Sequence, residues 1–128
     1  MPIFNFLFMI NFGQFMRSLG HAYTGLKFVW RENNFRIQIL VALVVIVLMY
    51  VYDLSRLERV ALLLVIMSVL ILEAMNTIFE HLADILKPRL HDYIKIIKDI
   101  MASVVLMAAV SAIIVGLIIF WPHVFGTK

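Results

Sequence analysis

The 128-residue chain contains no cysteine, and this absence excludes structural disulfides and metal sites built on thiolates. Charged residues are also scarce, at 15% of the chain against 64% for hydrophobic residues. With a mean hydropathy of +1.03, the chain is too apolar for a soluble domain of this length. Its net charge of +3 is spread along the sequence and predicts no nucleic-acid partner.

Two common kinds of functional motif are also missing. The sequence has no glycine-rich phosphate loop and no protein-kinase signature, so any nucleotide site must be built from side chains. The four histidines, at positions 21, 81, 91 and 123, lack the i,i+4 spacing of a zinc-binding helix.

Three apolar stretches, at about 35–52, 60–82 and 98–121, predict transmembrane helices. The sequence therefore predicts an all-α membrane protein with a single domain over residues 1–128. We expect a polar connection over 80–99, in which Pro88 ends or kinks any helix, and we expect the third span to close at Trp121 and Pro122.

Segment 1–30 precedes the first span and is amphipathic rather than continuously apolar. It lacks the basic start and the small-residue cleavage site of a signal peptide, so we expect an amphipathic surface helix. Residues 1–15 either lie on the membrane or pack against the helical bundle or a neighbouring subunit.

The basic residues predict the orientation of the spans. Eight of the eleven Lys and Arg residues precede the first span or lie between the second and third: Arg17, Lys27, Arg31, Arg36, Lys87, Arg89, Lys95 and Lys98. The positive-inside rule therefore places the N-terminus in the cytoplasm and the C-terminus outside.

Polar residues interrupt the end of the second span. Glu73, Asn76 and Glu80 are three and four residues apart and so share one helical face. A carboxylate inside a membrane segment is costly and normally marks a functional site. Glu73 lies about 10 Å deeper than the interfacial Glu80, at 1.5 Å per residue. With few waters around it, Glu73 suits a general base for a weakly acidic group such as a lipid hydroxyl, and Asn76, one turn along, could orient either of these two groups.

The cytoplasmic interface carries the groups that a nucleotide needs. Glu32 and Glu80 are predicted at the same depth and could together bind Mg²⁺, which with a nucleotide usually takes one or two protein carboxylates. Lys98, beside Asp99 at the start of the third span, could hold a phosphate as a compact charge. The active site is thus expected on the cytoplasmic side.

A stripe of small residues in the third span, Ala108, Ala112 and Gly116, allows close approach of helices. Because three helices cannot easily hide Glu73 and Asn76 within one subunit, we expect a homo-oligomer.

The motifs resemble those of the prokaryotic diacylglycerol kinase and undecaprenol kinase family. They are Glu73-Ala-Met-Asn76-Thr77-Ile-Phe-Glu80, Asp84, Lys98-Asp99, the stretch from Ser18 to Leu26, and Glu32-Asn-Asn-Phe35-Arg36. The resemblance covers Arg17 to Trp121. It implies a homotrimer in the bacterial cytoplasmic membrane, with three transmembrane helices and a surface helix per subunit and with active sites shared between subunits. It also implies transfer of the ATP γ-phosphoryl group to a lipid alcohol, with Mg²⁺.

The resemblance also implies a role for each matching residue. Glu73 would be the catalytic base and Asn76 its support, Glu32 and Glu80 the metal ligands, Lys98 and Asp99 the main ATP contacts, and His91 and His21 weaker ones. The family's Gram-negative diacylglycerol kinases carry a ligand-contacting arginine near the position of Gln14, and here the nearest arginine is Arg17, which could take over that role.

Two questions about function remain open at this point. The amino-acid sequences of the ENNFR and EAMNTIFE motifs favour undecaprenol as the acceptor, with diacylglycerol as the alternative. A non-enzymatic proton or cation conduit, or a scaffold, would explain Glu73 and Asn76. It would leave Glu32, Glu80 and the Lys98-Asp99 pair without a role, and the chain shows neither inverted repeats nor broken helices.

Overall fold

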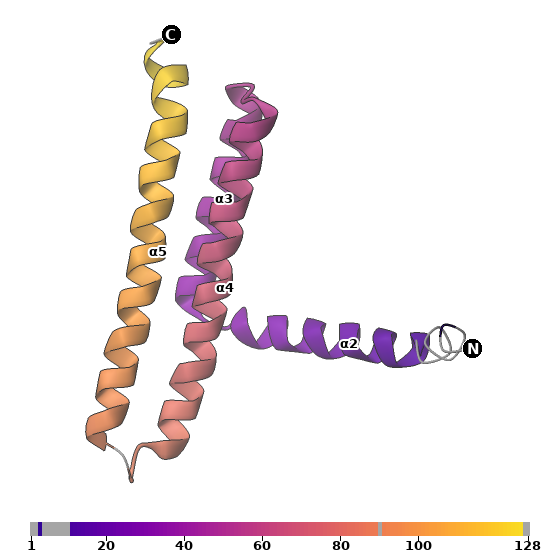
Figure 1. Cartoon of the computed structure of the whole chain (residues 1–128), viewed down its shortest axis with the longest axis vertical. Helices are drawn as coiled ribbons and strands as arrows, with labels where there is room; N and C mark the ends of the chain where they lie inside the picture. The colour runs from indigo at the N-terminus through magenta and orange to yellow at the C-terminus, as the bar shows by residue number, and fades with distance from the viewer. Residues whose placement is uncertain (1–2, 4–10, 90, 127–128) are drawn as a thin grey trace.

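The computed structural model describes residues 3, 11–89 and 91–126, and this part of the chain is helical throughout (Figure 1). The helices are α2 (Phe12–Val29), α3 (Asn33–Val51), α4 (Arg56–Leu86) and α5 (His91–Phe125). The expectations for residues 1–2 and 4–10 lie outside the described residues.

Three of these helices, α3, α4 and α5, are long and apolar enough to cross a membrane, which confirms the predicted all-α class with three apolar helices. They contain 19, 31 and 35 residues. At 1.5 Å per residue, α3 is about 28 Å long and matches a hydrocarbon core of about 30 Å, whereas α4 and α5 extend well beyond it.

The connection between α4 and α5 is much shorter than the expected polar segment over 80–99. Helix α4 continues to Leu86 and α5 begins at His91, so only the turn around Pro88 separates them. Helix α5 runs through Pro122 to Phe125, beyond the expected close of the third span at Trp121 and Pro122. A proline this close to a helix end removes a single backbone hydrogen bond, and the helix continues for only about one turn after it.

Helix α4 is the centre of the packing, since it contacts α3 on one side and α5 on the other. The three long helices run side by side, while α2 projects away from them (Figure 1). Met49, Leu54 and Leu62 form a small buried cluster near the α3–α4 turn. Most other apolar side chains of the long helices are exposed, as expected for surfaces that face lipid or another subunit.

Polar contacts hold the end of the bundle that is remote from α2. Ser55 and Glu58 form a capping box at the start of α4, in which each side chain accepts a hydrogen bond from the other residue's backbone N–H. The same Glu58 carboxylate accepts a hydrogen bond from His123 Nε2 at 3.0 Å. This ion pair ties the last turn of α5 to the first turn of α4.

We predict that His123→Gln destabilises the protein slightly. A partly exposed ion pair contributes about 0.2–1 kcal/mol to the free energy of unfolding. The Tm of the variant, measured in detergent, should therefore lie slightly below that of wild type. A wild-type Tm, or the same loss in a His21→Gln control, would contradict this prediction.

Candidate active site

Glu73 lies on α4 where α3 packs against it, and it is the most deeply buried charged residue in the described part of the chain, with 3% of its surface exposed. Its Oε2 accepts a hydrogen bond from Nε2 of Gln38 on α3 at 3.1 Å. One turn further along α4, the Thr77 hydroxyl donates to the Glu73 backbone carbonyl at 3.2 Å. The carboxylate is therefore enclosed and has a polar partner from a second helix.

A cavity of about 350 Å³ opens beside Glu73 between α4 and α5, with Asn34 of α3 also in its wall. Its lining includes four of the residues predicted from the sequence: Glu73, Asn76, Glu80 and Lys98. Asn76 Nδ2 donates to Glu80 Oε1 at 3.5 Å. The helical spacing thus brings the three α4 residues together as expected, and packing adds Lys98 from α5.

Lys98 faces the acidic side of α4 across this cavity. Its Nζ forms an ion pair with Asp84 Oδ1 at 3.2 Å, and 36% of its side chain remains exposed. Neighbouring Asp99 is exposed and does not line the cavity. The ammonium group of Lys98 thus neutralises the Asp84 carboxylate and is also accessible to the phosphate group of a ligand.

Glu32 lies at the N-cap of α3, just after the turn that follows α2. It does not line the cavity, but the carboxylates of Glu32 and Glu80 both lie within electrostatic range of Glu73. Among the described residues, no group of three or more His, Asp or Glu side chains is placed to hold a metal ion.

The remaining predicted contacts are not gathered at this cavity. Arg17 and His21 lie on α2, which has no buried residue, and the Arg17 Nε–H donates to the Gly13 carbonyl at 3.4 Å. His91 is exposed at the start of α5. Within the described chain, α2 is joined to the bundle by aromatic contacts near its C-terminal end. The Phe28 ring lies edge-on to His81 at 5.6 Å, and Trp30 lies edge-on to Phe35 at 6.4 Å.

Sequence reasoning missed Gln38 and assigned no role to His81. Gln38 was detectable as an uncharged polar residue inside an otherwise apolar span, which requires a polar partner. His81 donates through Nδ1 to the Thr77 carbonyl at 2.8 Å and also meets Phe28. Its position was not detectable, because it depends on how α2 meets α4.

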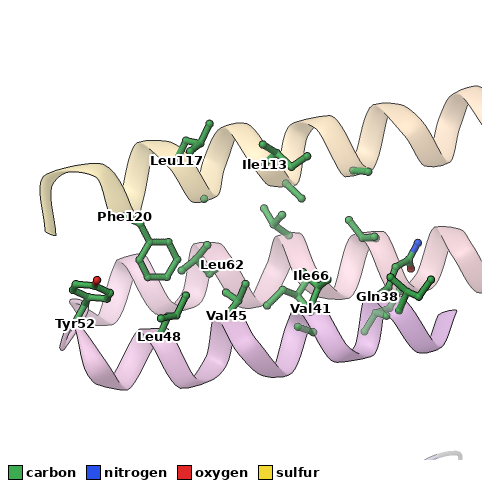
Figure 2. Close-up of a pocket in the computed structure, with 18 of the residues that line it drawn as sticks. Gln38, Val41, Val45, Leu48, Tyr52, Leu62, Ile66, Ile113, Leu117 and Phe120 are labelled. Carbon is green, nitrogen blue, oxygen red and sulfur yellow. The ribbon is translucent and has the colours of Figure 1, made fainter. Parts of the chain in front are cut away.

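A second, apolar cavity of about 560 Å³ lies among α3, α4 and α5. Figure 2 shows Gln38 at one end of its row of labelled side chains, with Tyr52 and Phe120 at the other end. Ala109 lines both cavities, so the apolar and polar cavities are neighbours. A buried carboxylate with a lysine and further carboxylates at the edge of an apolar region suits proton abstraction from a lipid alcohol beside a charged co-substrate.

Comparison with known proteins identifies the family of this chain. The family model described as prokaryotic diacylglycerol kinase matches residues 20–120. The chain belongs to this family. The match includes every predicted site residue except Arg17.

Curated relatives agree with this assignment over most of their length. The undecaprenol kinase of Bacillus subtilis is 34% identical over 110 residues, which cover 85% of this chain and 89% of the relative. The diacylglycerol kinase of Escherichia coli K12 is 29% identical over 117 residues, or 91% of this chain and 95% of the relative. The diacylglycerol kinase of Synechocystis is 34% identical over 101 residues, or 77% of this chain and 58% of the relative. The prediction of an ATP-dependent membrane lipid kinase is therefore confirmed.

Proposed function

We propose that this lipid kinase transfers the γ-phosphoryl group of ATP, with Mg²⁺, to the hydroxyl of undecaprenol. The observation that carries the proposal is the cavity that brings Glu73, Asn76, Glu80 and Lys98 together at the border of the apolar helices. The Bacillus subtilis relative, 34% identical over 110 residues, is named undecaprenol kinase and supports this acceptor. Diacylglycerol is the alternative, supported by the names of the Escherichia coli and Synechocystis relatives.

In this proposal, Glu73 takes the proton of the lipid hydroxyl as the oxygen attacks phosphorus. Its burial excludes bulk water, which would otherwise compete as the phosphoryl acceptor. The neighbouring apolar cavity offers space for the hydrocarbon part of the acceptor next to the base. Lys98 would hold phosphate oxygens, with Asp99 and, more weakly, His91, His21 and Arg17 as further contacts to the nucleotide.

Glu32 and Glu80 would hold Mg²⁺ together with the nucleotide phosphates. Glu80 fits this role because it lines the cavity beside Lys98, and a magnesium–nucleotide complex needs only one or two protein carboxylates. When bound, the ion supplies charge neutralisation at the phosphate oxygens. Asn76, which donates to Glu80, would keep that carboxylate turned towards the cavity.

We also propose a homotrimer with shared active sites, with α2 as an amphipathic helix on the cytoplasmic surface of the bacterial inner membrane. Two observations support this assembly. The apolar window of α5 has no buried residue, and Glu80 is exposed at the mouth of the cavity, where a neighbouring subunit could close the site. The distribution of Lys and Arg supports a cytoplasmic N-terminus and an external C-terminus.

The decisive experiment offers undecaprenol and diacylglycerol separately, in mixed micelles with labelled ATP. We expect Mg²⁺-dependent labelling of both lipids and a kcat/KM that is about tenfold or more higher for undecaprenol, equivalent to about 1.4 kcal/mol of transition-state discrimination. A preference for diacylglycerol would transfer the proposal to the alternative acceptor. Transfer to neither lipid by folded protein would refute both.

A further inference from the structure

The hydrogen bond between Gln38 and Glu73 joins two helices inside the membrane region. Gln38 extends from α3, and its Nε2 donates to Oε2 of the α4 glutamate at 3.1 Å. The amide oxygen of the same side chain, Gln38 Oε1, is buried and accepts no hydrogen bond within the described part of the chain.

The orientation of this amide is determined by its neighbour. An ionised carboxylate can only accept hydrogen bonds, so the amide must turn its NH₂ group towards Glu73 and its oxygen away from it. The oxygen is thereby left buried, in a residue that lines the apolar cavity at the end where Figure 2 labels Gln38.

This arrangement serves the carboxylate rather than the glutamine. The hydrogen bond satisfies one acceptor of the buried Glu73 carboxylate, whereas the Gln38 oxygen is left without a donor within the described part of the chain. An apolar side chain of similar length would avoid the unsatisfied oxygen but would deprive the buried carboxylate of its partner from α3. The glutamine at this position is therefore explained by its contact with Glu73.

We propose that Gln38 is a positioning residue for the transfer reaction: it fixes the carboxylate of Glu73 at the wall between the apolar and the polar cavity. Gln38 lines the first cavity, Glu73 lines the second, and their hydrogen bond connects the two. A glutamate held from α3 cannot rotate freely about its side-chain bonds on α4. The base is thereby kept in one place as the lipid hydroxyl approaches from the membrane. This inference rests on the proposed role of Glu73 as the base.

The test compares Gln38→Met with Gln38→His in the full-length protein in detergent. Methionine keeps the length and the apolar contacts but has no donor, whereas a neutral imidazole retains one N–H donor and one acceptor. We expect Gln38→Met to lower kcat about 10–100-fold, the usual effect of removing a group that orients a catalytic side chain. The KM for ATP should stay unchanged, whereas the Tm should fall because the buried carboxylate loses its donor from α3; kcat is therefore compared per folded protein. Gln38→His should recover a substantial part of kcat.

Ser68→Ala serves as the matched control, since Ser68 is a polar α4 residue whose hydroxyl donates only within its own helix, to the Leu64 carbonyl at 2.8 Å. It should leave kcat within about twofold of wild type. Three results would overturn the positioning role: wild-type kcat in Gln38→Met, equal losses in the methionine and histidine variants, or a kcat loss that disappears when activity is expressed per folded protein. If Glu73→Gln retains activity, Glu73 is not the base and the proposed function is overturned. The three results above, in contrast, overturn only the positioning role of Gln38.

Discussion

Glu73→Gln is expected to reduce kcat by about 10²–10⁴-fold, the contribution of a positioned general base to proton transfer. Glutamine matches the shape of glutamate but cannot take a proton from the lipid hydroxyl. No other carboxylate can replace it from the same place, because Glu80 lies two turns along α4 and is exposed at the cavity mouth. The KM for ATP should change little, because the phosphate-binding groups are untouched.

The variant is not expected to unfold. Replacing a buried carboxylate by a neutral amide removes the cost of burying a charge, and the Gln38 amide can still donate to the new side-chain oxygen. Thermal unfolding in detergent should therefore give a Tm equal to or above that of wild type. This combination of lost turnover and retained stability is what identifies a catalytic rather than a structural carboxylate.

The matched control is Glu58→Gln, which makes the same chemical change at the opposite end of the same helix. Glu58 caps α4 and pairs with His123, so its loss should lower the Tm slightly and leave kcat near the wild-type value. If both variants lose activity to the same degree, the effect is a general loss of charge on α4, and Glu73 is not the base.

The sequence predicted the three membrane helices because long apolar runs have few alternatives in a chain of this composition. It underestimated their length because hydropathy marks the part of a helix that lies in lipid, whereas backbone hydrogen bonding continues into polar sequence. The residues from Glu80 to Leu86 and from His91 to Asp99 are polar enough to suggest a loop, yet they form the continuous ends of α4 and α5.

The candidate site was predictable where it depends on spacing along one helix. Glu73, Asn76 and Glu80 share a face through periodicity alone. Contacts between helices were not predictable in the same way, since they depend on which turn of one helix meets which turn of the next. The Gln38–Glu73 hydrogen bond and the Lys98–Asp84 ion pair are of this kind. Lys98 was predicted as a phosphate-binding residue from its place at the start of the third span, and the resemblance implied the same role, but neither of them indicated Gln38.

Lys98→Met is expected to raise the KM for ATP by about 10–100-fold, because a hydrogen bond to a charged group contributes about 1.5–3 kcal/mol and each 1.4 kcal/mol is a factor of ten in affinity. Methionine retains most of the length and apolar packing of the lysine stem but carries no charge for a phosphate. Nucleotide affinity, measured directly by isothermal titration with ATP, should fall by a similar factor.

The ion pair with Asp84 offers a second explanation for any Lys98 phenotype, and Asp84→Asn separates the two. If Lys98 serves mainly to join α5 to α4, both substitutions break the same 3.2 Å contact and should lower the Tm equally while affecting ATP binding alike. If Lys98 binds phosphate, Asp84→Asn leaves its ammonium group in the cavity, released from a competing carboxylate. ATP affinity should then be retained or increased in Asp84→Asn and lost only in Lys98→Met. Such opposite effects of two partners in one ion pair cannot arise from a structural contact, because removal of either partner breaks that contact.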